Sequence, residues 1–238
     1  MRVAASKIRY QGTRASQEDF VSLFSIRNQG HVAVGGVLTD GIGGLPGGGR
    51  ASATVNAFSR TWLADELAAV VEGDADIASC LRRLPPAADE ALACYQSDSD
   101  TPDCGTTLVA AVILDDVCHF VSVGDSLVLA INADHTLARL NHVHNAERHG
   151  RLALTSAILG RGINAVDQGR VSLSPRGNHS ILLASDGIRT LRDDEIVAEL
   201  GHASEGPLRQ VVDRVRAKRA ASQDNLAMAL FRVVAVGA

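Results

Sequence analysis

The sequence has few aromatic residues and no long apolar run. Only 3% of its 238 residues are aromatic whereas 46% are hydrophobic, so a core would consist mainly of Ala, Val, Leu and Ile. No apolar stretch approaches membrane-spanning length, and the N-terminus lacks the apolar segment of a secretory signal. The net charge of −4 argues against nucleic-acid binding. These absences predict a cytoplasmic protein with neither a membrane nor a nucleic acid as partner.

Cysteine is scarce, and several catalytic motifs are missing. Cys80, Cys94, Cys104 and Cys118 form no C-x-x-C pair, so we expect reduced structural thiols rather than disulfides or a zinc site. The chain has no Gly-x-Ser-x-Gly elbow and no His-Glu-x-x-His. The Gly-rich segment 45–49 lacks the Lys and Ser/Thr of a P-loop. We expect it to be a flexible loop that leads into a helix.

Strand-like and helix-like patterns occur in blocks along the chain. Apolar and β-branched runs predict strands at 3–11, 20–26, 31–39, 171–173, 180–184 and 226–236, with a hairpin turn at 27–30. Three further runs, 106–114, 117–123 and 127–132, predict an antiparallel meander. Helical spacing predicts helices from about residue 51, over 76–95 with a break at Pro85 and Pro86, over 193–200 and over 207–220. This grouping favours a single α+β layered domain spanning 1–238.

Four aspartates stand in turn-like settings at the ends of apolar runs. They are Asp19, Asp40 within Asp-Gly-Ile-Gly-Gly, Asp186 within Ser-Asp-Gly, and Asp224 beside Asn225. A further Gly-Asp-Ser turn contains Asp125. Clustered carboxylates repel one another unless a cation lies between them, and carboxylate and backbone carbonyl oxygens suit Mg²⁺ or Mn²⁺. The pattern indicates a hard-metal site, although an Asp-Gly dipeptide alone is equally typical of a plain turn.

Two other groups of polar residues carry competing interpretations. Arg14, five residues before Asp19, offers a planar fork for phosphate oxygens, or it is a surface residue paired with Glu18. His142, His144 and His149 fall in one short segment. They would form a second metal site or supply a general acid, but such a run is more typical of a polar helix or loop.

The ordered set of motifs resembles the metal-dependent Ser/Thr protein phosphatases of the PPM type. The family's landmarks occur in order along nearly the whole chain: Arg14 with Glu18-Asp19, Asp40-Gly41-Ile42-Gly43-Gly44, Gly105-Thr106-Thr107, Gly124-Asp125-Ser126, Ile158-Leu159-Gly160, Ser185-Asp186-Gly187 and Asp224-Asn225. Each motif alone is common, but the full set in this order is specific.

The resemblance implies a four-layer α-β-β-α sandwich with two Mn²⁺ or Mg²⁺ ions at one end. It implies that Asp40 bridges the ions, that the Gly41 carbonyl binds one, and that Asp186 and Asp224 hold the other. Glu18 and Asp19 would act through water, and Asp125 with Asp186 would hold a third, weaker ion. Arg14 would bind the substrate phosphate. A metal-bridged hydroxide would then hydrolyse phosphoserine and phosphothreonine on proteins, reversing a partner Ser/Thr kinase in a bacterial regulatory pathway.

The sequence departs from the pattern at Ile42, where many relatives carry His or Met. A His there would protonate the leaving group, which Ile cannot do, so slower turnover of poor leaving groups is expected. The segment 141–164, where relatives carry a mobile flap, is short. Two alternatives stay open: a non-catalytic or weakly active module of the same fold that binds a phosphoprotein, and a small-molecule phosphoesterase. Retention of every metal-ligand position favours the protein phosphatase.

Overall fold

Two five-stranded antiparallel sheets lie face to face in the computed structural model, which describes residues 2–28, 31–71, 76–98, 103–148, 150–201 and 206–234. The first sheet has the order β1 (Arg2–Tyr10), β12 (Leu226–Val234), β11 (Asn178–Ala184), β6 (Leu127–Asn132) and β7 (Leu137–Arg139). The second has the order β10 (Asp167–Ser172), β5 (Val117–Val123), β4 (Leu108–Leu114), β3 (His31–Asp40) and β2 (Asp19–Asn28).

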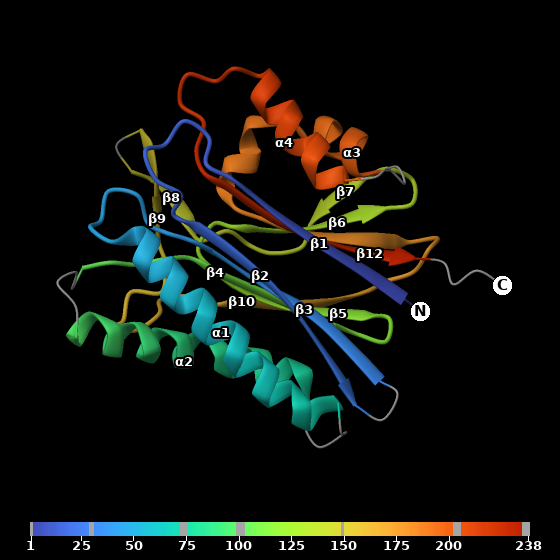
Figure 1. Ribbon diagram of the computed structural model, residues 1–238, viewed down its shortest axis with the longest axis horizontal. Coiled ribbons are helices and arrows are strands. Elements are labelled where there is room, and N and C mark those ends of the chain that lie inside the picture. The colour runs from blue at the N-terminus through green and yellow to red at the C-terminus, as the bar shows by residue number, and fades with distance from the viewer. Residues whose placement is uncertain are drawn as a thin grey trace.

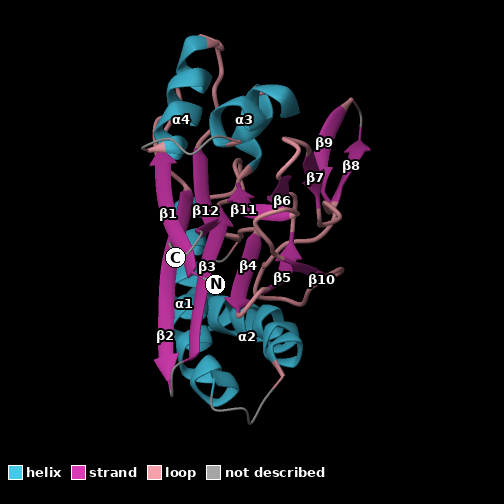
Figure 2. Ribbon diagram, turned by 90° about the vertical axis from the view of Figure 1, so that its right-hand side faces the viewer, coloured by secondary structure: helices cyan, strands magenta, loops and turns pink. Residues whose placement is uncertain are grey.

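Helices cover the outer face of each sheet (Figures 1 and 2). The second sheet is covered by α1 (Gly48–Val71) and α2 (Ile77–Ser97), and the first by α3 (Asp193–Leu200) and α4 (Pro207–Ala217). A short 3-10 helix, η1 (Asp186–Thr190), follows β11, and the strands β8 (Asn145–Arg148) and β9 (Arg151–Leu154) form a separate ribbon. The predicted four-layer α-β-β-α sandwich is therefore confirmed.

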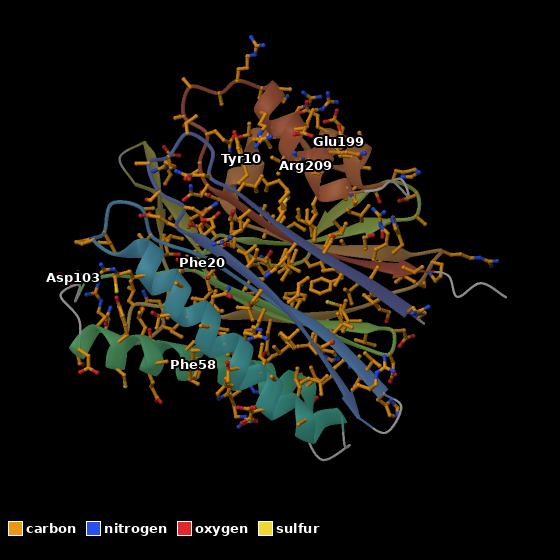
Figure 3. The ribbon with its side chains drawn as sticks, in the orientation of Figure 1. Tyr10, Phe20, Phe58, Asp103, Glu199 and Arg209 are labelled. Atoms are coloured by element: carbon orange, nitrogen blue, oxygen red, sulfur yellow. The ribbon has the colours of Figure 1, made fainter. Side chains whose placement is uncertain are left out.

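Three hydrophobic layers account for the near-continuous apolar strands. In β4, Leu108, Ala110 and Val112 face α1 and α2, whereas the alternate residues Val109, Ala111 and Ile113 face the other sheet. The strands β6, β11 and β12 alternate in the same way between the inner layer and the face under α3 and α4. A strand buried on both faces needs apolar residues at consecutive positions, as these sequences have. Side chains drawn as sticks fill the space between the layers (Figure 3).

The meander predicted for 106–132 is wrong at its last strand. β4 and β5 pair with each other, but β6 pairs with β11 and β7 in the opposite sheet. The turn around Asp125 therefore carries the chain from one sheet to the other. Hydrophobic runs identify buried strands but do not specify which neighbour each strand pairs with.

The predicted break at Pro85 and Pro86 is also wrong, because α2 continues through both prolines. Each proline lacks one helical N–H and costs about 3 kcal/mol in a helix interior. Burial of the apolar face offsets this cost, since each buried aliphatic side chain contributes about 1.5–3 kcal/mol. That face consists of Ile77, Cys80, Leu81, Leu84, Pro85, Ala88 and Leu92.

The remaining differences are local. Segment 142–148, expected to be a helix or loop, contains β8, and β10 begins earlier than the predicted strand at 171. The hairpin expected at 27–30 includes residues 29 and 30, and the last strand was expected to reach 236; residues 29, 30, 235 and 236 lie outside the described residues, as does His149. No helix among the described residues is both long and apolar enough to cross a membrane.

Candidate active site

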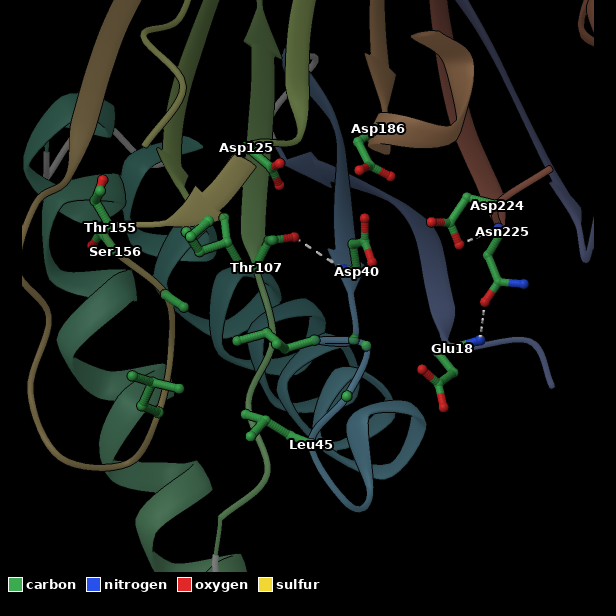
Figure 4. Close-up of a pocket in the computed structure, with 18 of the residues that line it drawn as sticks. Glu18, Asp40, Leu45, Thr107, Asp125, Thr155, Ser156, Asp186, Asp224 and Asn225 are labelled. Carbon is green, nitrogen blue, oxygen red and sulfur yellow. Dashed lines mark hydrogen bonds between the residues drawn. The ribbon is translucent and has the colours of Figure 1, made fainter. Parts of the chain in front are cut away.

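Carboxylates from both sheets meet at one end of the sandwich. Asp19 opens β2, Asp40 ends β3, and Asp125 lies in the turn between β5 and β6. Asp186 follows β11, and Asp224 precedes β12. Figure 4 shows Asp40, Asp125, Asp186 and Asp224 directed toward a common space. The predicted convergence of strand ends is thus observed, although the turn at Asp125 crosses between sheets.

This space is a pocket of about 920 Å³. Its lining includes all the predicted site residues except Asp19: Arg14, Glu18, Asp40, Gly41, Asp125, Asp186 and Asp224. Asp19 is only 1% exposed and lies behind the pocket surface. Its Oδ2 accepts a 2.6 Å hydrogen bond from the Ser185 hydroxyl, which in turn accepts one from the Ala227 N–H. Ser185 thereby links Asp19 of one sheet to β11 and β12 of the other.

Asp19 and Asp40 form a cross-strand pair, because their Cα atoms are register partners in β2 and β3. Burial raises the pKa of Asp19 to about 7. The pKa of Asp40 is raised well above its usual value by burial and then by the charges of Asp19, Asp186 and Asp125. Asp19 Oδ1 is buried without a hydrogen-bond partner among the described residues. These two carboxyl groups therefore need either protons or an external cation.

Asp186 shows the same effect more weakly. Burial, followed by the charges of Asp125 and Asp224, raises its pKa to about 6, while Arg189 and Arg14 act in the opposite direction. Within the described part of the chain, no group of three or more His, Cys, Asp or Glu side chains is already drawn together closely enough to hold a metal. The all-oxygen donor set and the unpartnered Asp19 Oδ1 nevertheless fit a hard cation such as Mg²⁺ or Mn²⁺.

Two carboxylates at the rim are already paired with arginines. Arg14 Nη2 lies 2.5 Å from Asp224 Oδ2, and both side chains are substantially exposed. Arg189 Nη1 lies 3.7 Å from Asp125 Oδ2, and its Nη2 donates to the Asp125 backbone carbonyl at 3.0 Å. The predicted alternative pairing of Arg14 with Glu18 is not present; Arg14 instead pairs with a predicted metal ligand.

The backbone at Asp40 is held by the Gly-Thr-Thr motif. The Asp40 N–H donates to Thr107 Oγ1 at 3.0 Å, and the Asp40 carbonyl accepts from the Thr107 N–H and the Thr106 hydroxyl. A Cβ on Gly41 would lie 2.5 Å from the carbonyl oxygen of Gly48, at the start of α1. Only glycine permits this close approach, which sets the turn after Asp40 against the helix.

Asn225 has a role that the sequence did not reveal. Its Oδ1 accepts from the Glu18 N–H at 2.8 Å, and its Nδ2 donates to the carbonyls of Gln11 and Ser16. These bonds shape the loop that carries Arg14. The Asp224-Asn225 motif signalled that the position matters, but only the fold shows that its partners lie more than 200 residues earlier.

His142 and His144 belong to the framework rather than to the pocket lining. His144 Nδ1 accepts a 3.1 Å hydrogen bond from the Gly124 N–H, next to Asp125. Burial lowers the pKa of His144 below its usual value. His142 donates its backbone N–H to Asp167. The cysteines are free, and burial raises the pKa of Cys80 to about 11 and of Cys118 to about 12, so these thiols are unreactive.

Comparisons with known proteins agree with this geometry. The family model described as "Protein phosphatase 2C" matches residues 11–230. A bacterial serine phosphatase matches with a TM-score of 0.80 and 20% identity over 100% of both chains. Serine/threonine phosphatase Stp1 from Staphylococcus aureus matches with a TM-score of 0.80 and 21% identity over 99% of this chain and 96% of that one.

A third solved structure, the Mycobacterium tuberculosis serine/threonine phosphatase PstP/Ppp, has a TM-score of 0.72 and 20% identity over 97% of this chain and 98% of that one. At these identities the likeness shows a shared fold. The comparison with curated proteins found no significant match.

Proposed function

This chain belongs to the protein phosphatase 2C family, and we propose that it hydrolyses phosphoserine and phosphothreonine on proteins with two Mn²⁺ or Mg²⁺ ions. The resemblance predicted from the ordered motifs is confirmed at the level of the family, whose members are metal-dependent in general. The observation that carries the proposal is the buried cross-strand pair Asp19 and Asp40, beside Asp186, whose side chains have no ion-pair partner among the described residues.

The residues that would hold the ions are those the sequence predicted. Asp40, Gly41, Asp186 and Asp224 line the pocket and would hold the ions directly. Glu18, also in the lining, and Asp19, buried behind it, are candidates for contact through water. Such cations supply positive charge that activates water as a nucleophile and offsets charge developing on a phosphoryl group. Asp125 remains the candidate for a third, weaker ion.

Arg14 is proposed to bind the substrate phosphate. Its guanidinium now pairs with the Asp224 carboxylate, and its side chain is 53% exposed. A planar guanidinium binds carboxylate and phosphate oxygens through the same fork, so Arg14 can exchange one anionic partner for the other. The loop bonds made by Asn225 hold its backbone beside the pocket during this exchange.

The described pocket lining contains no histidine, and Ile42 occupies the position beside Gly41. The carboxyl groups of the lining would be ionised once they hold cations, so the proton for the leaving alkoxide would come from water. The proposed substrates of this protein are phosphoproteins that a cognate Ser/Thr kinase has phosphorylated. A cytoplasmic location is part of the same proposal.

Phosphate release from a phosphothreonine peptide tests the proposal most directly. We expect release with added Mn²⁺ and its loss with excess chelator, while calorimetry of Mn²⁺ binding gives two sites on the same sample. Activity that persists in chelator contradicts the metal requirement. Tight peptide binding without release instead supports the alternative, a non-catalytic module that binds a phosphoprotein.

A further inference from the structure

One side of the pocket is formed by residues 155–165, here called the pocket wall. The wall faces the pocket with Thr155, Ser156, Ala157, Leu159, Arg161, Gly162 and Asn164. In Figure 4, Thr155 and Ser156 lie across the pocket from Glu18 and Asp224. The wall thus lies beside the carboxylates rather than among them. A phosphoryl group held by Arg14 and the proposed cations would not need the wall.

Hydrogen bonds join the two ends of the wall to each other, and further ones join the wall to Thr106, just before β4. Ser156 Oγ donates to the Ala165 carbonyl at 2.7 Å and accepts from the Ala165 N–H at 2.9 Å. Thr106 and Ile158 exchange both backbone hydrogen bonds, at 3.0 and 2.9 Å. Ile158 is fully buried. These contacts fix the two ends of the wall but leave residues 159–162 without a strand partner.

A carboxylate on α2 holds that middle part. Asp89 is 7% exposed. Its Oδ1 accepts from the N–H groups of Leu159 at 2.9 Å and Gly160 at 2.7 Å, and its Oδ2 accepts from Gly162 at 2.7 Å. Hydrogen bonds from backbone amides to an ionised carboxylate are about twice as strong as neutral ones. A single buried side chain therefore orders the four residues that include Arg161.

Gln96 supports the same contact from two turns further along α2. Its Nε2 donates to the Leu159 carbonyl at 3.1 Å and to the Cys104 carbonyl at 2.9 Å. The fit is tight, since a Cβ on Gly160 would lie 3.0 Å from the Ala93 Cα. The wall backbone therefore packs directly on α2, and the helix rather than the wall itself determines the wall's position.

We propose that Asp89 is a positioning residue that determines selectivity for phosphorylated polypeptides over small phosphate esters. The choice of substrate in this inference rests on the proposed function. The clamp, meaning the three hydrogen bonds from the wall backbone to Asp89, does not. The held segment presents Leu159 and Arg161 on one side of the pocket, as an apolar and a cationic surface for the polypeptide flanking the phosphorylated residue. The Arg161 side chain is 65% exposed, and its Nη1 lies 3.6 Å from Oδ1 of the exposed Asp103. An aryl phosphate is too small to contact the wall while its phosphoryl group is bound beside Arg14.

The experiment compares four variants with the wild type: Asp89→Ala, Asp89→Asn, Gln96→Met and the control Glu90→Gln. Glu90 is the exposed neighbour of Asp89 on α2. For each protein, kcat and KM are measured with Mn²⁺ on a phosphothreonine peptide and on p-nitrophenyl phosphate. Amide hydrogen exchange of Leu159, Gly160 and Gly162 is followed without substrate, and thermal unfolding confirms that each variant is folded.

We expect Asp89→Ala to lower kcat/KM for the peptide about 10- to 100-fold, mainly through KM, with less than about a 2-fold change on the aryl phosphate. Exchange should increase at all three amides. In Asp89→Asn the amide carbonyl can still serve Leu159 and Gly160, but its NH₂ would face the Gly162 N–H, so Gly162 should lose protection first. Gln96→Met should act in the same direction by a smaller factor, and Glu90→Gln should match the wild type.

Two results would overturn the inference. Unchanged exchange at the three amides in Asp89→Ala would show that Asp89 does not hold the wall, and an equal loss on both substrates would show that its role is only structural. If the wild type releases phosphate from neither substrate, the proposed function fails, whereas the exchange data still decide whether the clamp exists. Should Asp89→Ala not fold, Asp89→Asn and Gln96→Met carry the same test.

Discussion

The carboxylates at this end of the sandwich form two regions that differ in how their charge is balanced. At the rim, Asp224 pairs with Arg14 and Asp125 with Arg189. In the interior, Asp19 and Asp40 are register partners on the neighbouring strands β2 and β3. Asp19 Oδ1 has no hydrogen-bond partner among the described residues. The rim thus contains its own counterions, whereas the part of the chain that the structure describes places no counterion beside the inner pair.

An added cation would therefore have its largest effect at the inner pair. At the rim a cation must compete with an arginine, but at the inner pair it replaces only repulsion and desolvation. Substitutions in the inner pair should therefore affect catalysis and metal binding most, and those at the rim should affect substrate binding and local stability.

Asp40→Asn breaks the inner pair and should have the largest effect. Phosphatase activity should fall about 10²–10³-fold, because the loss of one carboxylate removes a ligand at the pocket centre. The same change should raise the melting temperature of the metal-free protein, because it removes buried repulsion, and it should reduce the increase in melting temperature caused by Mn²⁺. Asp65→Asn, at an exposed position of α1, is the matched control. Full activity of Asp40→Asn would refute the site assignment.

Arg14→Met tests the rim on the side of the proposed phosphate contact. Activity on a phosphopeptide should fall about 10- to 100-fold, because the guanidinium fork is lost. Stability should change by less than about 0.5 kcal/mol, because the Arg14–Asp224 pair is exposed. Steady-state kinetics and urea unfolding measure the two effects. Full recovery by Arg14→Lys would argue against a fork that binds two oxygens.

The pH dependence of the unfolding free energy of the metal-free protein tests the repulsion within the inner region. The folded-state pKa of Asp19, about 7, and of Asp186, about 6, exceed the usual aspartate value of 3.8, so the folded state binds protons more tightly than the unfolded chain. Unfolding free energy in chelator should fall as pH rises from about 4 to 7, by on the order of 5 kcal/mol. Urea unfolding measures the slope, and Asp19→Asn should flatten it. A rise in stability over this range would contradict the repulsion.

Arg189→Met removes the counterion from Asp125. We expect a loss of about 1 kcal/mol in unfolding free energy, because the pair is partly buried and the Asp125 carbonyl also loses a donor. The control is Arg161→Met, whose partner Asp103 is 72% exposed, and it should cost less than about 0.5 kcal/mol. Equal losses in the two variants would mean that the Asp125 pair is no stronger than a surface pair.

Ile42→His adds a titratable group to the pocket without altering either carboxylate region. A histidine there can protonate the leaving group, so turnover of a phosphopeptide should rise by a few-fold, below the roughly 10²-fold of an optimised general acid. Turnover of an aryl phosphate, whose leaving group needs less protonation, should not change. No gain on the peptide would show that Ile42 does not limit the rate.

Local sequence was enough to predict which carboxylates line the pocket, but not the hydrogen bonds that shape it. Asp40, Asp125, Asp186 and Asp224 were recognisable because each follows or precedes an apolar strand, and strand ends converge. The contacts of Asn225 and Asp89 were not predictable, since the partners of Asn225 lie more than 200 residues away and those of Asp89 about 70 residues away. Their sequence neighbourhoods give no sign of these contacts.

The errors in the fold have the same origin. β6 was assigned to the wrong sheet because its apolar pattern matches that of a strand in either sheet. The two prolines were expected to end α2, because proline preference acts locally whereas packing of the helix face depends on α1 and the second sheet. In both cases a contact distant in sequence outweighed the local signal.

The pairing of β1 with β12 has a consequence for the order of events during synthesis. β1 pairs along its whole length with β12, from Arg2 with Val234 to Tyr10 with Leu226. A ribosome makes β1 first and β12 more than 200 residues later, so β1 emerges without its partner strand. Asp224 and Asn225, which complete the pocket, are translated just before β12. The pocket of the nascent chain is therefore incomplete until β12 can insert, and until then the edge of β1 is a surface that chaperones can bind.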